Sequence, residues 1–168
     1  MFRVADMLRT GRAAVALALT LILAACAQNP DDPGDGAIVA GALGTGPGGV
    51  QEFTVTVRDR VFFETDSSEL SAASRATLDR QAQWLLLYPQ YTVMIQGHAD
   101  ERGTREYNIA LGGRRAAAVQ AYLASRGVLL SRISTISYGK ERPVAVCNDI
   151  SCWSQNRRAV TAINNVGV

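Results

Sequence analysis

The sequence predicts one α/β (α+β) sandwich of βαβαβ type in residues 51–168, preceded by two segments that lack a core. Two helical stripes of apolar residues alternate along the chain with short apolar runs that suit strands. Strands that alternate with helices are typical of domains in which helices cover a sheet. This length is sufficient for a single hydrophobic core.

Residues 1–25 have the pattern of a bacterial export signal. Arg3, Arg9 and Arg12 precede an apolar run, 13–25, that is too short for an ordinary membrane span. The run ends in Leu-Ala-Ala before Cys26, which matches the lipobox after which bacteria attach lipid to the cysteine. We expect cleavage before Cys26, lipidation of Cys26 and sorting to the outer membrane. A plain cleaved signal followed by a chance cysteine is the alternative.

The residues after Cys26, up to residue 50, predict a flexible tether. They are rich in Gly, Pro, Asp and Ala and include DDPGDG and GTGPGG. Fully extended, this segment reaches at most about 80 Å. Three of the 17 basic and one of the 15 acidic side chains lie in residues 1–25. The remainder is therefore neutral, and its charge does not suggest nucleic-acid binding.

The first half of the domain predicts strands followed by a helix. Phe53, Val55 and Val57 alternate with polar residues, which favours a strand, and the apolar segment 61–63 follows. Ser71 is the expected N-cap of a helix that ends at Pro89. The apolar stripe of this helix comprises Leu78, Ala82, Leu85 and Tyr88.

The second half continues the alternation. The apolar segment 93–95 predicts a buried strand, and 97–103 a polar loop. Thr104 is the expected cap of a helix with Tyr107 in its first turn, and Gly127 closes it. The remaining strands are expected at 133–138 and 159–164.

Arg115 lies on the apolar stripe of this second helix, together with Leu111, Val119, Tyr122 and Leu123. An arginine is rarely buried without a partner, because an uncompensated buried charge is costly. The nearest source of an anion is Asp100 in the preceding loop. From the residues alone, a snorkelling side chain or an ion pair with Asp100 competes with a ligand site.

These motifs closely resemble the OmpA-like peptidoglycan-binding domain family. Its core pattern is G-H-[TA]-D-x-x-G, then N-x-x-L, then R-A, which here is Gly97-His98-Ala99-Asp100-Glu101-Arg102-Gly103, Asn108 with Leu111, and Arg115-Ala116. The segments GHADERGT, 137–141 and 156–159 look like the lipoprotein members in particular. The resemblance covers residues 57–164 and implies a small mixed sheet backed by helices.

The resemblance further implies a site for the diaminopimelate side chain of the peptidoglycan stem peptide. Asp100 and Arg115 match the ligand-holding Asp and Arg of the family. A carboxylate suits the ammonium of that zwitterion, and a guanidinium fork suits its carboxylate. Glu64 stands where the family usually has Asp, so its side-chain role is in doubt. The other expected site residues are Asn108, Leu111, Thr65, Asp66 and Ala99.

The function implied is to hold the outer membrane to the wall, together with the Tol proteins, chiefly the propeller protein TolB, during cell division. No cofactor and no metal are expected. A lipoprotein outside the Tol system is the alternative. An enzyme, such as a peptidoglycan hydrolase, is disfavoured because His98 is the one histidine and no nucleophile motif occurs.

Two smaller predictions concern His98 and the cysteines. His98 is expected to hydrogen-bond within its loop and so to order it. Cys147 and Cys152 can pair, because an exported domain meets an oxidising compartment. A zinc site is disfavoured, because no further histidine lies nearby.

Overall fold

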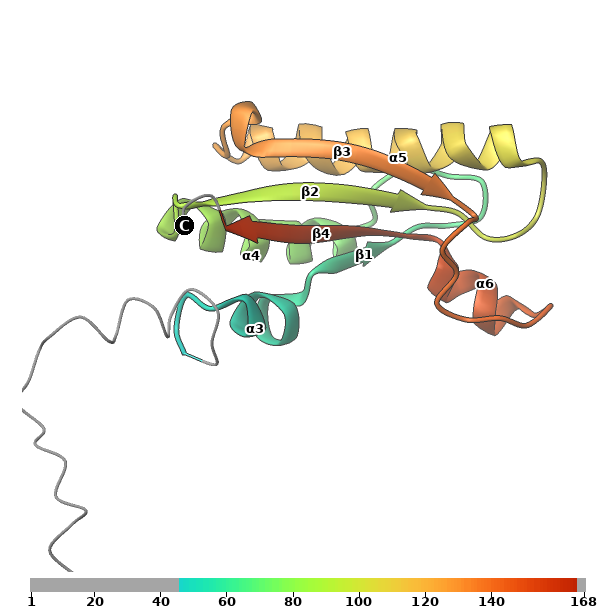
Figure 1. Ribbon diagram of the computed structural model, residues 1–168, viewed down its shortest axis with the longest axis horizontal. Coiled ribbons are helices and arrows are strands. Elements are labelled where there is room, and N and C mark those ends of the chain that lie inside the picture. Colours follow the sequence, from blue (N-terminus) through green and yellow to red (C-terminus); the bar gives the residue numbers. More distant parts are fainter. Residues whose placement is uncertain (1–45, 166–168) are drawn as a thin grey trace, which may run out of the picture. The chain divides into compact units, whose positions relative to one another are not determined.

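A computed structural model describes residues 46–165 (Figure 1). The predicted signal, Cys26 and the predicted tether up to residue 45 lie outside the described residues. The elements are, in chain order, α3 (Val50–Glu52), η1 (Phe53–Arg58), β1 (Arg60–Phe62), α4 (Ala72–Leu87), β2 (Tyr91–His98), α5 (Arg105–Ser125), η2 (Leu130–Arg132), β3 (Ile133–Gly139), α6 (Ile150–Asn156) and β4 (Arg158–Asn165).

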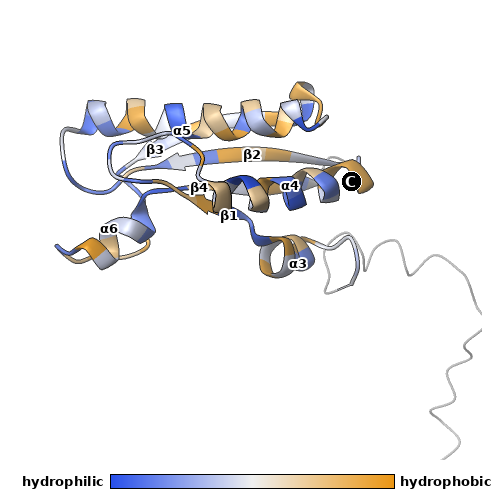
Figure 2. Cartoon of the chain, turned by 180° about the vertical axis from the view of Figure 1, so that it is seen from behind, coloured by the Kyte–Doolittle hydropathy of each residue, from blue (hydrophilic) through white to orange (hydrophobic). Residues whose placement is uncertain are grey.

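The four strands form one mixed sheet in the order β1-β4-β2-β3. β4 pairs antiparallel with both β1 and β2, whereas β2 and β3 are parallel and connected by α5. Helices α4 and α5 lie side by side on one face of the sheet, as Figures 1 and 2 show from opposite sides. The predicted α/β sandwich is confirmed, and the insertion of β4 between β1 and β2 makes the sheet mixed.

The strand predicted at 53–57 is wrong, because this segment is helical. Phe53 and Val57 are buried, but Val55 between them is 68% exposed. A spacing of four residues places two side chains on one face of a helix as readily as on one face of a strand. Phe53 packs on Trp84 of α4, with 4.9 Å between ring centroids, so tertiary packing selects the helix.

The predicted caps of both long helices are confirmed. The Ser71 hydroxyl accepts a hydrogen bond from the Ser74 amide at the start of α4 (3.1 Å), and Thr104 does the same for Tyr107 in α5 (3.2 Å). α4 ends just before Pro89, as predicted, and the stripe residues Leu78, Ala82 and Leu85 are buried.

Two glycines bring α5 directly against β2. A Cβ atom at Gly97 would lie 1.8 Å from the Gly112 carbonyl oxygen, and one at Gly112 would lie 2.4 Å from the Ser137 hydroxyl. No other residue type fits at this crossing. The close approach places Arg115, one turn further along α5, beneath the loop that follows β2.

Cys147 and Cys152 form a disulfide immediately before and within α6, with 5.7 Å between Cα atoms. The pairing expected from the sequence is thus present in the structure. Within residues 46–165, no helix combines the length and the hydropathy needed to cross a membrane.

Candidate functional site

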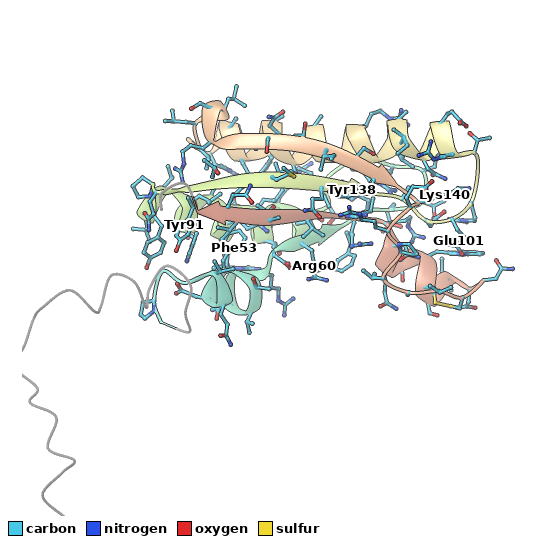
Figure 3. The ribbon with its side chains drawn as sticks, viewed as in Figure 1. Phe53, Arg60, Tyr91, Glu101, Tyr138 and Lys140 are labelled. Carbon is cyan, nitrogen blue, oxygen red and sulfur yellow. A yellow bond between two sulfur atoms is a disulfide. The ribbon has the colours of Figure 1, made fainter. Side chains whose placement is uncertain are left out.

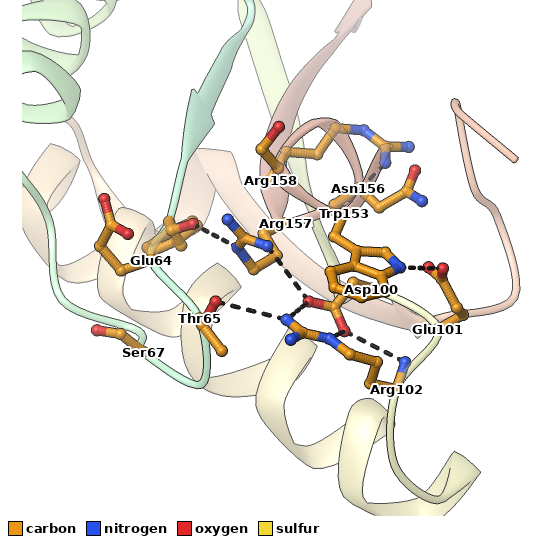
Figure 4. A network of polar contacts seen from close by, with 12 residues as sticks. Glu64, Thr65, Ser67, Asp100, Glu101, Arg102, Trp153, Asn156, Arg157 and Arg158 are labelled. Atoms are coloured by element: carbon orange, nitrogen blue, oxygen red, sulfur yellow. Dashed lines mark hydrogen bonds and ion pairs between the residues drawn. The ribbon is translucent and has the colours of Figure 1, made fainter. Parts of the chain in front are cut away.

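Three segments meet at the end of the sheet where β2 and β3 stop. They are the loop 99–103 between β2 and α5, the turn 64–67 after β1, and the helix α6 with the first residues of β4 (Figure 4). Two hydrogen bonds fix the loop 99–103 to the end of β3. The Ala99 amide donates to the Gly139 carbonyl (2.8 Å), and Lys140 Nζ donates to the Gly103 carbonyl (2.7 Å). The backbone of the loop is therefore held in one arrangement.

The Asp100 carboxylate is the centre of this cluster. Arg102 donates to it from its backbone amide (3.2 Å), from Nε (3.1 Å) and from Nη2 (2.6 Å). The buried Arg157 approaches from the other side, with Nη1 3.5 Å from Oδ2. Burial raises the pKa of Asp100, but the hydrogen bonds from Arg102 and then Arg157 outweigh it and place the pKa below its usual range. The carboxylate is charged at neutral pH.

Arg102 lies over Asp100 at the surface. Its side chain is 40% exposed, and its guanidinium carbon lies 4.2 Å from the centroid of the Trp153 ring. Trp153 is held in turn by a hydrogen bond from its indole N–H to the Glu101 carboxylate. Arg102 is thus a partly exposed side chain that rests on an aromatic ring from α6, and it is the outermost partner of Asp100.

Arg115 is fully buried, and backbone carbonyls receive its guanidinium. Nε donates to the Ser67 carbonyl (2.8 Å), Nη1 to the His98 carbonyl (2.8 Å) and Nη2 to the Glu64 carbonyl (3.0 Å). Burial lowers the pKa of Arg115 to about 10, so the side chain stays charged at neutral pH. One side chain therefore fastens the turn 64–67 to the end of β2.

The ion pair between Arg115 and Asp100, one of the alternatives left open by the sequence, is wrong. Within the described residues, Arg115 forms no ion pair, and Asp100 pairs with Arg102 and Arg157 instead. Three carbonyl dipoles satisfy the guanidinium at hydrogen-bonding distance, which a sequence pattern does not reveal.

The remaining predicted site residues surround these charges. The Asn108 side-chain amide donates to the Arg102 carbonyl (2.7 Å). Leu111 on α5 and Ala99 at the start of the loop are both buried. Thr65 and Asp66 are exposed in the facing turn. The Thr65 hydroxyl accepts from Arg102 (3.4 Å), and Asp66, at φ 54°, accepts from the Tyr107 hydroxyl. The Glu64 side chain is exposed, and its backbone carbonyl makes the contact with Arg115.

Sequence reasoning missed Arg157 and Trp153. Arg157 donates from Nε to the Phe63 carbonyl (3.0 Å) as well as facing Asp100, so it joins β1 to the loop. Arg157 lies in the segment 156–159, which matches the family, but the sequence does not indicate what this arginine contacts. Trp153 had no signal, because only the placement of α6 beside the loop brings it to Arg102.

His98 differs from its expected role. Its ring is buried beside Tyr138, with 5.5 Å between ring centroids, and neither ring nitrogen has a hydrogen-bond partner within residues 46–165. His98 orders the site through its backbone carbonyl, which Arg115 holds. Burial, and then the charges of Arg158 and Arg142, lower the pKa of His98 to about 4.

This pKa predicts a stability that falls on acidification. Between about pH 6.5 and 4 the unfolded chain protonates His98 and the folded chain does not, so stability increases with pH across that window. His98→Phe, which keeps an aromatic ring, is expected to remove about 3 kcal/mol of this dependence between pH 7 and 4. Urea unfolding at pH 7, 5.5 and 4 measures it. Parallel losses in wild type and variant would contradict the expectation.

Two hollows flank the cluster, and neither includes the Asp100 carboxylate. A groove of about 750 Å³ runs between β1, α4 and α6, and it shares Phe63, Glu64 and Arg157 with the cluster. A smaller hollow of about 340 Å³ lies between Ala99, Glu101 and the disulfide loop. Arg102 fills the space above Asp100, so ligand access to this carboxylate requires that Arg102 moves.

The chemistry of the cluster is that of ionic recognition. Within residues 46–165, no group of three or more His, Cys, Asp or Glu side chains is arranged to hold a metal ion. A buried carboxylate beneath one exposed arginine instead suits a cationic ligand group, and the surrounding guanidinium groups suit an anionic one.

The OmpA family model matches residues 62–157. The chain is 62% identical over 154 residues to the peptidoglycan-associated lipoprotein of Rhizobium meliloti, which covers 91% of this chain and 88% of that one. It is 41% identical over 163 residues to the peptidoglycan-associated lipoprotein of Pseudomonas aeruginosa, which covers 91% of this chain and 96% of that one.

Solved structures show the same fold. The crystal structure of the peptidoglycan-associated lipoprotein from Burkholderia pseudomallei aligns with a TM-score of 0.64 at 41% identity, covering 66% of this chain and 96% of that chain. The C-terminal domain of Helicobacter pylori MotB aligns with a TM-score of 0.60 at 22% identity, covering 65% and 86%.

Proposed function

The chain belongs to the OmpA family and, within it, to the peptidoglycan-associated lipoproteins, and from this premise we propose that it binds peptidoglycan non-covalently through the diaminopimelate of the stem peptide. The observation that carries the proposal is the buried Asp100 carboxylate, whose one exposed partner is Arg102. A ligand ammonium replaces Arg102 there with a charge of the same sign, so Asp100 never remains uncompensated.

The carboxylate of the same zwitterion is assigned to the guanidinium groups around Asp100. Arg115 uses three of its five N–H groups on carbonyls. Direct contact with Arg115, the partner expected from the resemblance, requires the turn 64–67 to move aside, since this turn contributes to its burial. We propose that Arg102, displaced from Asp100, pairs with the incoming carboxylate.

Each such contact is modest, because a charge-assisted hydrogen bond contributes about 1.5–3 kcal/mol. Many copies in one membrane facing one polymer sheet would supply strong retention through avidity. The proposal includes lipidation at Cys26, an outer-membrane anchor and a periplasmic domain, which the lipobox and the names of the relatives support. On the basis of the family resemblance, we also propose that the protein acts together with TolB and the other Tol proteins.

The proposed role is binding and not catalysis. The chain shares its family with lipoproteins named for association with peptidoglycan. The one histidine, His98, is buried, and burial and the charges of Arg158 and Arg142 lower its pKa, which does not suit a general base at the surface.

The test is co-sedimentation of the mature, lipidated chain in detergent with two kinds of sacculi. One carries diaminopimelate in its stem peptides, and the other carries lysine, which keeps the terminal ammonium and lacks the neighbouring carboxylate. We expect pelleting with the first, a loss of about 10-fold or more in affinity for the second, and no released muropeptides. Equal binding to both kinds, or sustained muropeptide release, would overturn the proposal.

A further inference from the structure

Four leucines are exposed at the end of the domain opposite to Asp100. They are Leu86 and Leu87 in the last turn of α4, and Leu129 and Leu130 between α5 and β3, with exposed fractions of 50%, 73%, 65% and 60%. Figure 2 shows apolar residues at that end of α4 and in the turn that follows α5. We call these four residues the leucine patch.

The two halves of the leucine patch are neighbours in space. The Cδ atoms of Leu86 lie 3.9–4.0 Å from the position of a Cβ on Gly127, just before Leu129. Arg132, two residues after Leu130, donates a hydrogen bond to the carbonyl of Tyr88 (3.1 Å), which directly follows Leu87. It also donates to the Tyr91 carbonyl (2.9 Å). The patch is therefore one surface with two contributing segments.

The described chain also begins at this end. Gly48 is buried and packs against the Tyr88 ring, and its carbonyl accepts a hydrogen bond from the Tyr91 hydroxyl (2.8 Å). Tyr88 and Tyr91 are the same residues whose carbonyls hold the turn beside Leu130. The first described residues, which follow the segment from Cys26 in the sequence, therefore lie beside the leucine patch.

The cluster around Asp100, for which we propose peptidoglycan binding, lies at the other end. β2 runs from Tyr91 at the patch end to His98 at the cluster, which is roughly 26 Å for its eight residues. Figure 3 shows Tyr91 and Glu101 toward opposite ends of the sheet. The anchor side and the proposed ligand side are thus separated by the length of the sheet.

We propose that the leucine patch docks on the phospholipid surface in which Cys26 is anchored. The inference rests on the lipidation included in the proposed function. Residues 26–45 span at most about 70 Å when extended, so the lipid anchor limits how far this end of the domain can lie from the bilayer surface. Exposed leucines beside a lipid anchor suit the headgroup boundary. Docking by this end points Asp100 away from the membrane and toward the wall.

The experiment reads membrane contact directly in the full mature chain. Lipidated Leu130→Trp and Val146→Trp are reconstituted in vesicles of phosphatidylethanolamine and phosphatidylglycerol, with and without brominated acyl chains. Val146 is the matched control, an apolar residue 88% exposed near the Asp100 end. Emission of wild type, which contains Trp84 and Trp153, is subtracted.

We expect brominated lipid to quench the added emission of Leu130→Trp about twofold more than that of Val146→Trp. Equal quenching at both positions would overturn the docking. So would quenching that appears only when vesicles hold one copy each, because a second copy would then cover the patch at higher density. Vesicle flotation of wild type reports lipidation separately, and sacculus binding by a variant with all four leucines changed to Ser should be unchanged.

Discussion

Replacing Arg115 by methionine is expected to lower the free energy of unfolding by about 3–5 kcal/mol. Methionine keeps much of the side-chain volume but donates no hydrogen bond, so the carbonyls of Glu64, Ser67 and His98 lose their common partner. A domain of this size has a total stability of about 5–15 kcal/mol, so the variant approaches the limit of folding. Urea unfolding monitored by circular dichroism measures the loss.

Arg114→Met is the matched control, because Arg114 precedes Arg115 on the same helix and is exposed. Its replacement is expected to change stability by less than about 0.5 kcal/mol. Arg115→Lys should fall between the two, since one ammonium cannot reach three carbonyls arranged around a planar fork. Equal stabilities of Arg115→Met and Arg114→Met would show that the three carbonyl contacts do not hold the turn.

The expected cost of removing Arg115 decides how the site can be tested. A variant that loses sacculus binding because it unfolds says nothing about ligand contact. Asp100 is the better target, because Asn at this position keeps the shape and one acceptor oxygen while removing the charge.

The fold was largely predictable, because burial follows apolar periodicity in α4, α5 and the long strands. The helices were found with their caps, since Ser71 and Thr104 signal a helix start through their own side chains. The segment 53–57 was misread as a strand, because its apolar spacing of four residues fits both structures. Packing of Phe53 on Trp84, which is distant in sequence, decided the outcome.

The proximity of the predicted site residues was readable from the sequence, but their pairing was not. The motif residues Asp100, Asn108 and Arg115 do meet at one end of the sheet. Which arginine pairs with Asp100 was not readable, because Arg115 binds backbone carbonyls, and these have no sequence signal. Arg157 reaches Asp100 only because β4 inserts into the middle of the sheet, a feature of topology and not of local pattern.

Asp100→Asn is expected to weaken binding to diaminopimelate-containing sacculi by about 10- to 100-fold, the cost of one charge-assisted hydrogen-bonded pair. The asparagine keeps the shape of the site but presents no negative charge to the ligand ammonium. Asp79→Asn is the matched control, because Asp79 also pairs with an exposed arginine, Arg126 (2.8 Å), and is 41% exposed on α4.

The most direct measurement of the central claim is therefore the sacculus-binding isotherm of wild type, Asp100→Asn and Asp79→Asn, each shown to be folded by its thermal transition. The account predicts that Asp79→Asn binds like wild type and that Asp100→Asn loses most of its retention on the pellet. Wild-type binding by a folded Asp100→Asn would contradict the assignment of the ligand ammonium to this carboxylate.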